Sequence, residues 1–209
     1  KGLKDSRAGV LVGGRATVED AYGYSKFARV TLATNNIDFR SRVSSKEELD
    51  FLASVPTSAT YKDIDNADHV VLINFEPEDE SPIVFLRIYK QVHKRSIKVT
   101  TIAALASRGS QKLKANLIKT AAGNEVSAIN SISGLTGKSV VLVGERAAET
   151  QGALSAVAKL VKESGAKLGW VPRRAGERGA IAAGALPNLL PGARPIEDAS
   201  ARVDIATAW

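Results

Sequence analysis

Four carboxylates within five residues form the densest acidic group of the sequence: Glu76, Glu78, Asp79 and Glu80. They follow an apolar run typical of a buried strand, residues 69–75 (HVVLINF). Ligands of open α/β sheets bind beyond the carboxyl ends of the strands. Carboxylates at that place attract a divalent cation and repel a pyrophosphate. The other interpretation is a solvated acidic cluster that stabilises the start of the next helix, and it is the favoured one.

Two glycine-containing turns have the composition of phosphate-binding loops. Residues 134–139 (GLTGKS) end like a P-loop, but Ile132 stands where the first glycine belongs and the segment precedes a strand. Gly13 and Gly14 follow an apolar run, without the third glycine of a dinucleotide fingerprint. We expect residues 134–139 to bind no phosphate. For Gly13 and Gly14, a tight strand-to-helix turn is favoured over a phosphate cradle.

Three arginines lie close together in RRAGERG, at Arg173, Arg174 and Arg178. Guanidinium groups clamp anions through forked hydrogen bonds, and they equally serve as ion-pair partners that hold an irregular loop. Both interpretations stay open.

Other catalytic chemistry has little support in the sequence. No cysteine is present, which excludes thiolate zinc sites and cysteine-ligated iron–sulfur clusters within this chain. His69 and His93 are too few for a histidine-rich metal site, and no serine-nucleophile motif is found. We therefore expect no catalytic, cofactor-binding or metal-ligating residue.

The net charge of +7 comes mainly from one segment. Residues 81–124 contain no acidic side chain and nine basic ones: Arg87, Lys90, Lys94, Arg95, Lys98, Arg108, Lys112, Lys114 and Lys119. We expect Lys90, Lys94, Arg95 and Lys98 to project together from one end of a helix. A solvated face, an acidic protein partner and a nucleic acid are the three interpretations. Nucleic acid ranks last because aromatic residues, which stack on bases, make up only 5% of the chain.

Composition bounds the class of protein. With 209 residues, 44% apolar and 24% charged, the chain is of the ordinary globular class. No apolar run approaches the ~20 residues of a transmembrane helix, and the first residues do not form a signal peptide, so we expect no membrane insertion. Because methionine is absent throughout, we expect a piece of a longer chain.

Short apolar runs alternate with helical periodicity, which predicts an α/β fold of parallel strands joined by helices. Strands are expected at residues 8–13, 69–75, 97–102, 139–144 and 167–171. Helices are expected at residues 18–32, at residues 45–55 before Pro56, and at residues 151–163. A further helix is expected to start at Pro82, and its apolar face consists of Phe85, Ile88, Tyr89 and Val92. Residues 76–80 are expected as a loop. Residues 172–195, rich in Gly, Pro and Arg, predict a long ordered loop.

One short sequence occurs twice. Residues 10–16 (VLVGGRA) match residues 141–147 (VLVGERA) at six of seven positions. Duplication and convergence both explain the repeat. Convergence is favoured because the helices that follow do not match.

Several stretches together resemble the molybdopterin oxidoreductase family. Residues 17–22 (TVEDAY), 26–29 (KFAR) and 34–38 (TNNID) resemble the opening of its second domain. Residues 67–73 (ADHVVLI), with Glu76-Pro77-Glu78 and Pro82, resemble its ADVVLVVGxNPxExxP segment. Residues 170–179 (WVPRRAGERG) and 185–192 (ALPNLLPG) look like the family of large iron–sulfur subunits (G subunits) of bacterial NADH–quinone oxidoreductases (respiratory complex I), in its actinobacterial form.

The resemblance implies a fold and a division of the chain. It implies Rossmann-like parallel sheets with helices on both faces, followed by the Gly/Pro/Arg-rich ordered loop. Residues 1–60 and 136–209 would form one discontinuous domain, and residues 61–125 an inserted Rossmann-like domain. Residues 126–135 would be a linker. Both copies of the repeat would then lie in the same domain.

The resemblance also implies a function. It indicates a non-catalytic structural fragment that supports NADH-to-quinone electron transfer by shielding clusters and docking partner subunits. The parent's iron–sulfur clusters would lie upstream, in a peripheral arm on the cytoplasmic side of the membrane. The alternative is a fragment of an active molybdopterin enzyme such as a formate dehydrogenase.

The sequence departs from the cofactor-binding pattern of this family at three places. A glycine is missing at residues 73–75 (INF), and Glu76 stands where asparagine is usual. The acidic residue that usually ends the next strand is absent from residues 100–103 (TTIA). Loss of the glycine hinders close approach of the backbone to phosphate, and Glu76 adds like charge. We expect a retained fold without the pterin cofactor.

Overall fold

The computed structural model describes residues 2–3, 7–42, 44–54 and 59–209. Contacts divide the chain into two units. Unit 1 comprises Lys1–Pro56 and Arg174–Trp209, and unit 2 comprises Thr57–Arg173.

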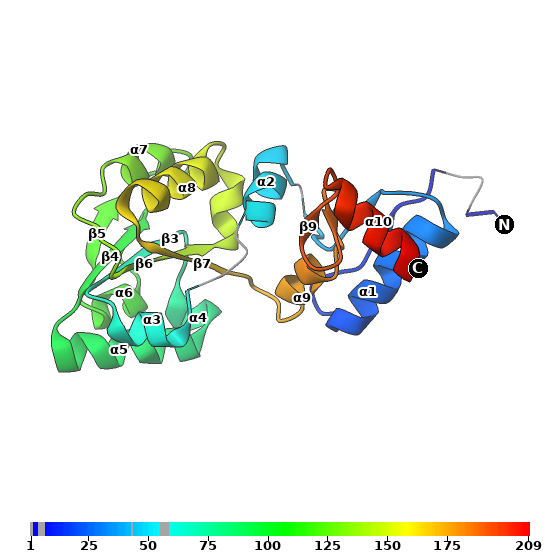
Figure 1. Cartoon of the computed structure of the whole chain (residues 1–209). Helices are drawn as coiled ribbons and strands as arrows, with labels where there is room; N and C mark the ends of the chain where they lie inside the picture. Colours follow the sequence, from blue (N-terminus) through cyan, green and yellow to red (C-terminus); the bar gives the residue numbers. More distant parts are fainter. Residues whose placement is uncertain (1, 4–6, 43, 55–58) are drawn as a thin grey trace. The chain divides into compact units, whose positions relative to one another are not determined.

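Unit 2 is built on a parallel five-stranded sheet (Figure 1). Its strands are β3 (His69–Ile73), β4 (Lys98–Ala103), β5 (Asn116–Lys119), β6 (Ser139–Gly144) and β7 (Lys167–Val171). Their spatial order is β5-β4-β3-β6-β7, and all the ladders are parallel. The chain therefore moves outward from β3 to one edge and then resumes on the other side of β3. The switch point of this topology lies between β3 and β6, where α/β sheets bind ligands.

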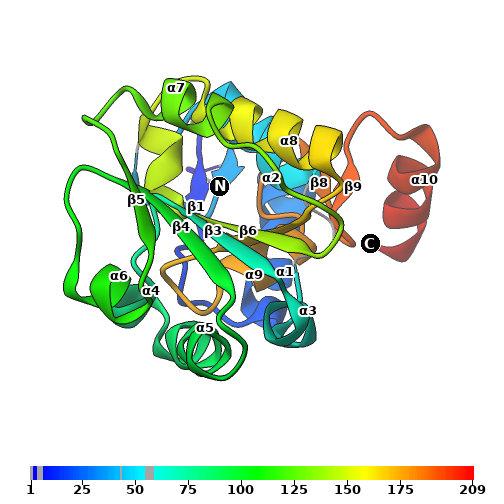
Figure 2. The same cartoon turned by 90° about the vertical axis from the view of Figure 1, so that its left-hand side faces the viewer.

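Helices cover both faces of this sheet, as the family resemblance implied. They are α3 (Tyr61–Asn66), α4 (Pro77–Glu80), α5 (Pro82–Arg95), α6 (Arg108–Lys112), α7 (Glu125–Asn130), the 3₁₀ helix η2 (Glu145–Glu149) and α8 (Ala153–Ser164). Figure 2 shows α7 and α8 on one face, and α3 and α5 on the other. Strands covered on both faces are apolar throughout rather than alternating. Accordingly, every residue of β3 and β6 is buried.

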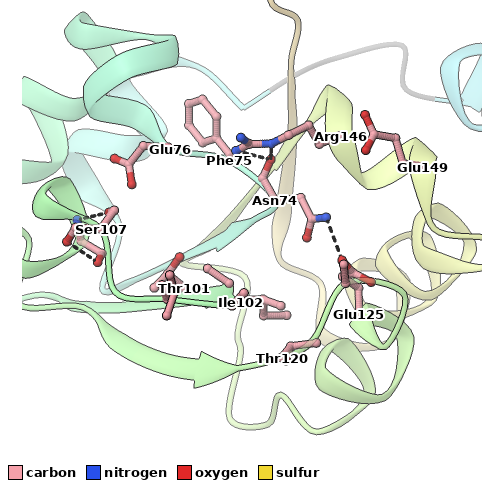
Figure 3. Close-up of a pocket in the computed structure, with 15 residues that line it drawn as sticks. Asn74, Phe75, Glu76, Thr101, Ile102, Ser107, Thr120, Glu125, Arg146 and Glu149 are labelled. Atoms are coloured by element: carbon pink, nitrogen blue, oxygen red, sulfur yellow. Dashed lines mark hydrogen bonds between the residues drawn. The ribbon is translucent and has the colours of Figure 1, made fainter. Parts of the chain in front are cut away.

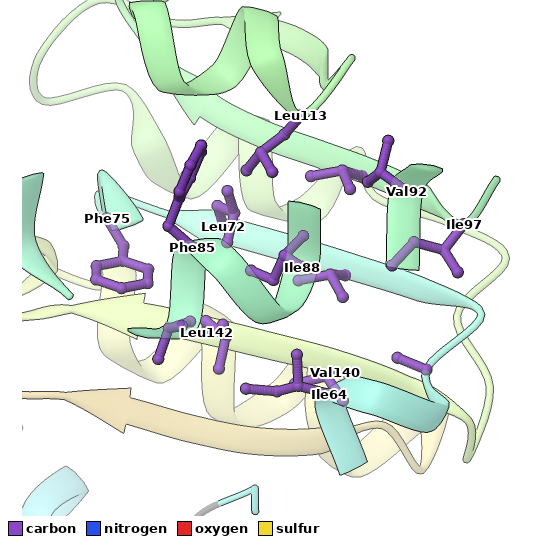
Figure 4. Close-up of a cluster of buried hydrophobic side chains, with 14 residues drawn as sticks. Ile64, Leu72, Phe75, Phe85, Ile88, Val92, Ile97, Leu113, Val140 and Leu142 are labelled. Atoms are coloured by element: carbon purple, nitrogen blue, oxygen red, sulfur yellow. The ribbon is translucent and has the colours of Figure 1, made fainter. Parts of the chain in front are cut away.

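The core beneath α5 confirms most of the predicted helix face (Figure 4). Phe85, Ile88 and Val92 are buried in a cluster with sheet residues such as Leu72 and Leu142. Pro82 stands in the first turn, where its missing N–H costs no hydrogen bond. Tyr89 was also assigned to the buried face. That assignment is wrong, because its side chain is 39% exposed.

Unit 1 contains shorter elements. They are β1 (Val10–Leu11), α1 (Val18–Lys26), a π-helix (Phe27–Thr31), β2 (Ile37–Asp38), α2 (Lys46–Ser54), α9 (Glu177–Ala182), β8 (Leu189–Leu190), β9 (Arg194–Pro195) and α10 (Ala199–Ala208). Thr17 caps α1 by accepting a hydrogen bond from the Asp20 amide at 3.1 Å. Pro56, expected to end the second helix, lies outside the described residues.

Three predicted elements are corrected. The strand expected at residues 8–13 is reduced to Val10–Leu11, which pairs with β2, and Leu11 is 61% exposed. The loop expected at residues 76–80 contains α4, and the Glu76 side chain caps this helix by accepting a hydrogen bond from the Glu78 amide. The ordered loop expected at residues 172–195 contains α9 and the antiparallel pair β8–β9.

The domain boundaries also differ from those expected. A discontinuous unit and an inserted unit exist, but the chain returns to unit 1 at Arg174 rather than at residue 136. The reason is the pairing of β6 with β3 along its length, from His69↔Ser139 to Ile73↔Val143. The expected linker at residues 126–135 is largely helix α7, which buries Ala128 and Ile129. The two copies of the repeat thus lie in different units.

Candidate functional site

A cavity of about 340 Å³ opens at the carboxyl edge of the unit 2 sheet (Figure 3). It is formed by the residues that follow β3, β4 and β5, together with the start of α7 and η2. The polar residues that line it are Asn74, Glu76, Thr101, Ser107, Ser110, Thr120, Glu125, Arg146 and Glu149. Its position beside the switch point makes it the best candidate site of unit 2.

Asn74 stands at the glycine position of the family motif, and its backbone keeps the conformation that glycine favours. Its φ is +48°, in the left-handed region that asparagine tolerates better than most residues. A Cβ on the neighbouring Gly144 would lie 2.4 Å from the Asn74 carbonyl oxygen. The ends of β3 and β6 are therefore in close contact, and the crevice between them is filled by backbone.

Glu125 holds the Asn74 side chain from across the cavity. Asn74 Nδ2 donates to Glu125 Oε1 at 3.3 Å, and Thr150 Oγ1 donates to Glu125 Oε2 at 2.8 Å. Burial by itself would raise the pKa of this carboxyl group. Hydrogen bonds from Thr150, backbone amides and Asn74 outweigh burial and leave the Glu125 pKa below its usual value. The carboxylate is thus ionised at neutral pH.

Arg146 closes the opposite side of the cavity. Its Nε and Nη2 donate to the Asn74 carbonyl oxygen at 3.3 and 3.2 Å. Its Nη2 also binds Glu80 Oε1 at 2.6 Å, and Arg173 Nε lies 3.6 Å from the second oxygen of Glu80. Two nitrogens of this guanidinium, Nε and Nη2, are therefore held by internal partners.

The four predicted carboxylates serve different structural roles. Glu80 pairs with Arg146, and Glu78 forms an ion pair with Lys112 of α6. A Cβ on Gly109 of α6 would lie 2.3 Å from Glu76 Oε1, so α6 packs directly on the acidic segment. Asp79 is exposed. Within the described part of the chain, no group of three or more histidine or carboxylate side chains is arranged to hold a metal ion.

The cavity does not fit the pterin dinucleotide that the fold family implies. A phosphate-bearing ligand would meet the carboxylates of Glu76, Glu125 and Glu149, while the single arginine of the lining is bound to Glu80. Asn74 adds a side chain where the motif needs the bare backbone of glycine. These residues repel an anion and leave little room for close backbone approach to phosphate.

The turn at Gly13 and Gly14 is filled from within unit 1. A Cβ on Gly14 would lie 2.7 Å from Glu177 Oε1, and Gly176 N donates to the Gly14 carbonyl oxygen at 2.9 Å. Glu177 is fully buried and pairs with Arg174 at 3.2 Å. The carboxylate of Glu177 thus lies against this turn, where its negative charge would repel a phosphate. The interpretation as a tight structural turn is the one that agrees with this packing.

The remaining motifs have structural surroundings. Arg173 forms an ion pair with Glu80, and Arg174 forms one with Glu177, which agrees with their interpretation as ion-pair partners. Arg178 is exposed. Residues 134–138 precede β6 and Ser139 is its first residue, so the segment leads into a strand, as the sequence indicated.

The basic segment is less uniform than predicted. Arg95 donates to the backbone carbonyl oxygens of Asp65 and Ala67 at 2.6 and 3.1 Å, so it holds the end of α3. Arg87 binds Asp65 at 2.5 Å. The expectation that Arg95 projects together with Lys90, Lys94 and Lys98 is therefore wrong. Its guanidinium turns back because unsatisfied carbonyl groups at the end of α3 accept its hydrogen bonds.

Sequence reasoning missed the polar groups that organise unit 1. Arg29 donates to the carbonyl oxygens of Gly184, Leu186 and Leu189 at 2.8 to 3.0 Å, and burial lowers its pKa. Arg40 forms a buried ion pair with Glu48 at 2.8 Å. Their partners lie in distant segments or depend on a turn, so spacing alone gives no signal for them. Arg146 had a signal, since it lies in the second copy of the repeat.

The profile of the molybdopterin oxidoreductase family matches residues 1–171. The chain belongs to the molybdopterin oxidoreductase family. Within it, the chain is 52% identical over 214 residues to the G subunit of the NADH-quinone oxidoreductase of Mycobacterium bovis and of Mycobacterium tuberculosis. It is 43% identical over 236 residues to the protein of the same name from Streptomyces coelicolor.

Each of these alignments covers 97% of the chain, but the chain spans only about 27% of the length of the mycobacterial relatives and 28% of the Streptomyces protein. The relatives confirm the predicted resemblance to actinobacterial G subunits. They do not favour the alternative of an active molybdopterin enzyme. None of the described helices is long and apolar enough to cross a membrane.

Proposed function

We propose that this molybdopterin oxidoreductase-family chain is a non-catalytic structural module of the large subunit of an NADH–quinone oxidoreductase. In this role it supports NADH-to-quinone electron transfer by shielding electron-carrying clusters on neighbouring domains and by docking partner subunits. The observation that carries the proposal is the 52% identity to the mycobacterial G subunit over 97% of the chain. The candidate site supports it, because Arg146, the one cationic side chain among the described residues that line the cavity, forms an internal ion pair with Glu80.

The proposal includes the absence of a cofactor from this part of the subunit. Cysteine is absent from the sequence, so iron–sulfur clusters ligated by cysteine must lie elsewhere in the complex. The carboxylates of the cavity disfavour a pterin dinucleotide. The module would belong to the peripheral arm on the cytoplasmic side of the membrane, with other subunits of the complex as partners and without contact to nucleic acid.

The test separates assembly from turnover. Arg146→Ala and Glu125→Gln are introduced into the whole subunit, with Arg15→Ala, an exposed arginine in the other copy of the repeat, as the matched control. We expect less assembled complex for the two cavity variants. NADH:quinone turnover per assembled complex should equal that of the wild type. Normal assembly with lost turnover would show a catalytic role and overturn the proposal.

Metal analysis of the purified complex tests the cofactor part separately. We expect no stoichiometric molybdenum or tungsten and no pterin fluorescence after oxidation of the denatured protein. Stoichiometric metal together with a pterin, both lost in Asn74→Asp, would place a cofactor at this cavity. That result would promote the active molybdopterin enzyme.

A further inference from the structure

Helix α5 has two apolar faces in its first half. Residues 82–89 (PIVFLRIY) contain, besides Pro82, six apolar or aromatic side chains and one charge. Val84, Phe85 and Ile88 pack against the sheet, whereas Ile83 and Leu86 are 55% and 56% exposed. A helical stretch that is apolar all round is normally buried on all sides. Unit 2 buries only one of the two faces.

The exposed side chains form a single stripe along α5. Ile83, Leu86, Lys90 and His93 recur with spacings of three, four and three residues, which places them on one face of a helix. Lys94 lies next to them, and all five residues are exposed. Tyr89 lies beside the stripe, with its ring 4.2 Å from that of His93. Figures 1 and 2 show α5 along the outside of the sheet, beside α3.

The stripe is apolar at its start and basic at its end. In the described part of the chain, Lys90 and Lys94 form no ion pair, whereas Arg87, Arg95 and Lys112 are each paired with a carboxylate. The segment from residue 81 to 124 contains no carboxylate of its own. The two lysines therefore keep an unneutralised positive charge next to exposed Ile83 and Leu86.

We infer that this stripe, Ile83, Leu86, Lys90, His93 and Lys94, is a docking surface for an acidic amphipathic helix of another subunit of the complex. The partner's apolar side chains pack against Ile83 and Leu86, and its carboxylates pair with Lys90 and Lys94. The three-four spacing matches the ridges by which helices pack together. Protein interfaces combine buried apolar side chains with charged side chains at their edge, and the stripe offers both kinds. This inference rests on the proposed function, because it takes the partner to be a subunit of that complex.

A photoreactive residue identifies the occupant directly. Leu86 is replaced by benzoylphenylalanine in the whole subunit, and the purified complex is irradiated and analysed by mass spectrometry. We expect a cross-link to a helix of another subunit that contains several carboxylates. A cross-link to a second copy of this chain, to another part of the same subunit, or to no protein at all would overturn the inference.

Charge reversal tests the energetics of the same surface. The double variant Lys90→Glu/Lys94→Glu is compared with Lys138→Glu/Lys162→Glu, two other exposed lysines of unit 2 that carry the same change of charge. We expect the α5 variant to reduce retention of the subunit in the complex about tenfold, and the control to have no effect. Reversing the cross-linked carboxylates to lysine should restore retention. Melting temperatures of the two isolated variants should agree, because exposed charges contribute little to folding.

The two proposals fail in different ways. If the α5 variants assemble normally in a complex that depends on this subunit, the docking inference alone is wrong. If the wild-type complex assembles and oxidises NADH with quinone in the absence of this subunit, the proposed function is wrong. Binding of duplex DNA by the isolated chain that persists at physiological salt, where charges are screened over ~8 Å, would assign the stripe to nucleic acid and overturn the inference.

Discussion

A seven-residue pattern that occurs twice, with six of seven residues identical, adopts two different structures in this chain. In unit 2, residues 141–147 begin within β6, where all six strand residues are buried between β3 and β7. In unit 1, residues 10–16 give a strand of two residues that pairs with β2 on one side, and Leu11 is 61% exposed. Identical local preferences therefore produce a central strand only where neighbours stand on both sides. Strand propensity reflects this packing environment more than the residues themselves.

The two tryptophans allow each unit to be followed separately. Trp170 lies buried in β7 of unit 2, and Trp209 follows α10 in unit 1, where its Nε1 donates to the Tyr22 hydroxyl at 2.7 Å. Trp209→Phe leaves a reporter of unit 2 alone, and Trp170→Phe leaves a reporter of unit 1. Urea unfolding in these two backgrounds gives the free energies of unfolding compared below.

The largest contrast should come from a charge at the shared leucine. Leu142→Asp places an unpaired carboxylate in the sheet core and should reduce the unfolding free energy of unit 2 by about 4 kcal/mol or more. Leu11→Asp, at the matching exposed position, should change unit 1 by about 0.5 kcal/mol. Val71→Asp, in fully buried β3, should behave like Leu142→Asp. Equal losses for the two leucines would contradict the difference in burial.

Lowering the pH from 7 should reduce the stability of unit 2 selectively, because both histidines lie in this unit. Burial, together with the charge of Lys98, lowers the pKa of His69 to about 4, and its Nε2 lies 2.9 Å from Thr100 Oγ1. The unfolded chain therefore binds a proton that the folded unit does not, between pH 6.5 and 4. Stability from this group is present above pH 6.5 and is lost as the pH falls, by up to about 3 kcal/mol.

Urea unfolding at pH 7 and at pH 4.5, monitored through Trp170, measures this loss. His69→Asn should remove most of the pH dependence of unit 2 in this range, whereas His93→Asn, at an exposed position, should leave it in place. A pH dependence that survives His69→Asn would assign the effect to carboxylates.

The shared glycine gives a smaller contrast. Gly144→Ala brings a methyl group against the backbone of Asn74, and backbone atoms cannot move aside as the end of a side chain can. The substitution should therefore reduce the unfolding free energy of unit 2 by about 2 kcal/mol. Gly14→Ala meets the side chains of Glu177 and Arg174, whose long chains adjust more easily, and should cost about 1 kcal/mol. The two unfolding free energies, read in the matching tryptophan backgrounds, measure the difference. A larger cost in unit 1 would mean that the packing around Gly14 is the more rigid.

The shared arginine should give the smallest effect. Arg146→Ala removes the partner of Glu80 and of the Asn74 carbonyl group, and should reduce the stability of unit 2 by about 1 kcal/mol, since this guanidinium is partly exposed. Arg15→Ala, at an exposed position, should have no measurable effect. Restoration of stability in the double variant Arg146→Ala/Glu80→Gln would confirm that the lost ion pair is the cause. If the second substitution restores nothing, the bonds to Asn74 dominate.

Much of unit 2 was predictable from the sequence because its signals are local. Continuous apolar runs identified β6 and β7 at their observed bounds, and Pro82 identified the start of α5. The turn chemistry at the candidate site was less visible. Asn74 looked like a lost glycine, yet it retains the left-handed backbone and adds a side chain that binds Glu125.

What the sequence alone determined is the α/β class, the parallel strands, the lack of cysteine-based sites and the resemblance to the G subunits of bacterial NADH–quinone oxidoreductases. Tertiary structure decided which strands share a sheet, how far each is buried and where the guanidinium groups point. Arg95 illustrates the reason: its charge was evident, but its direction depends on carbonyl oxygens at the end of α3 that only folding places within reach. Long-range pairing of this kind depends on positions in space, and spacing along the chain carries no record of it.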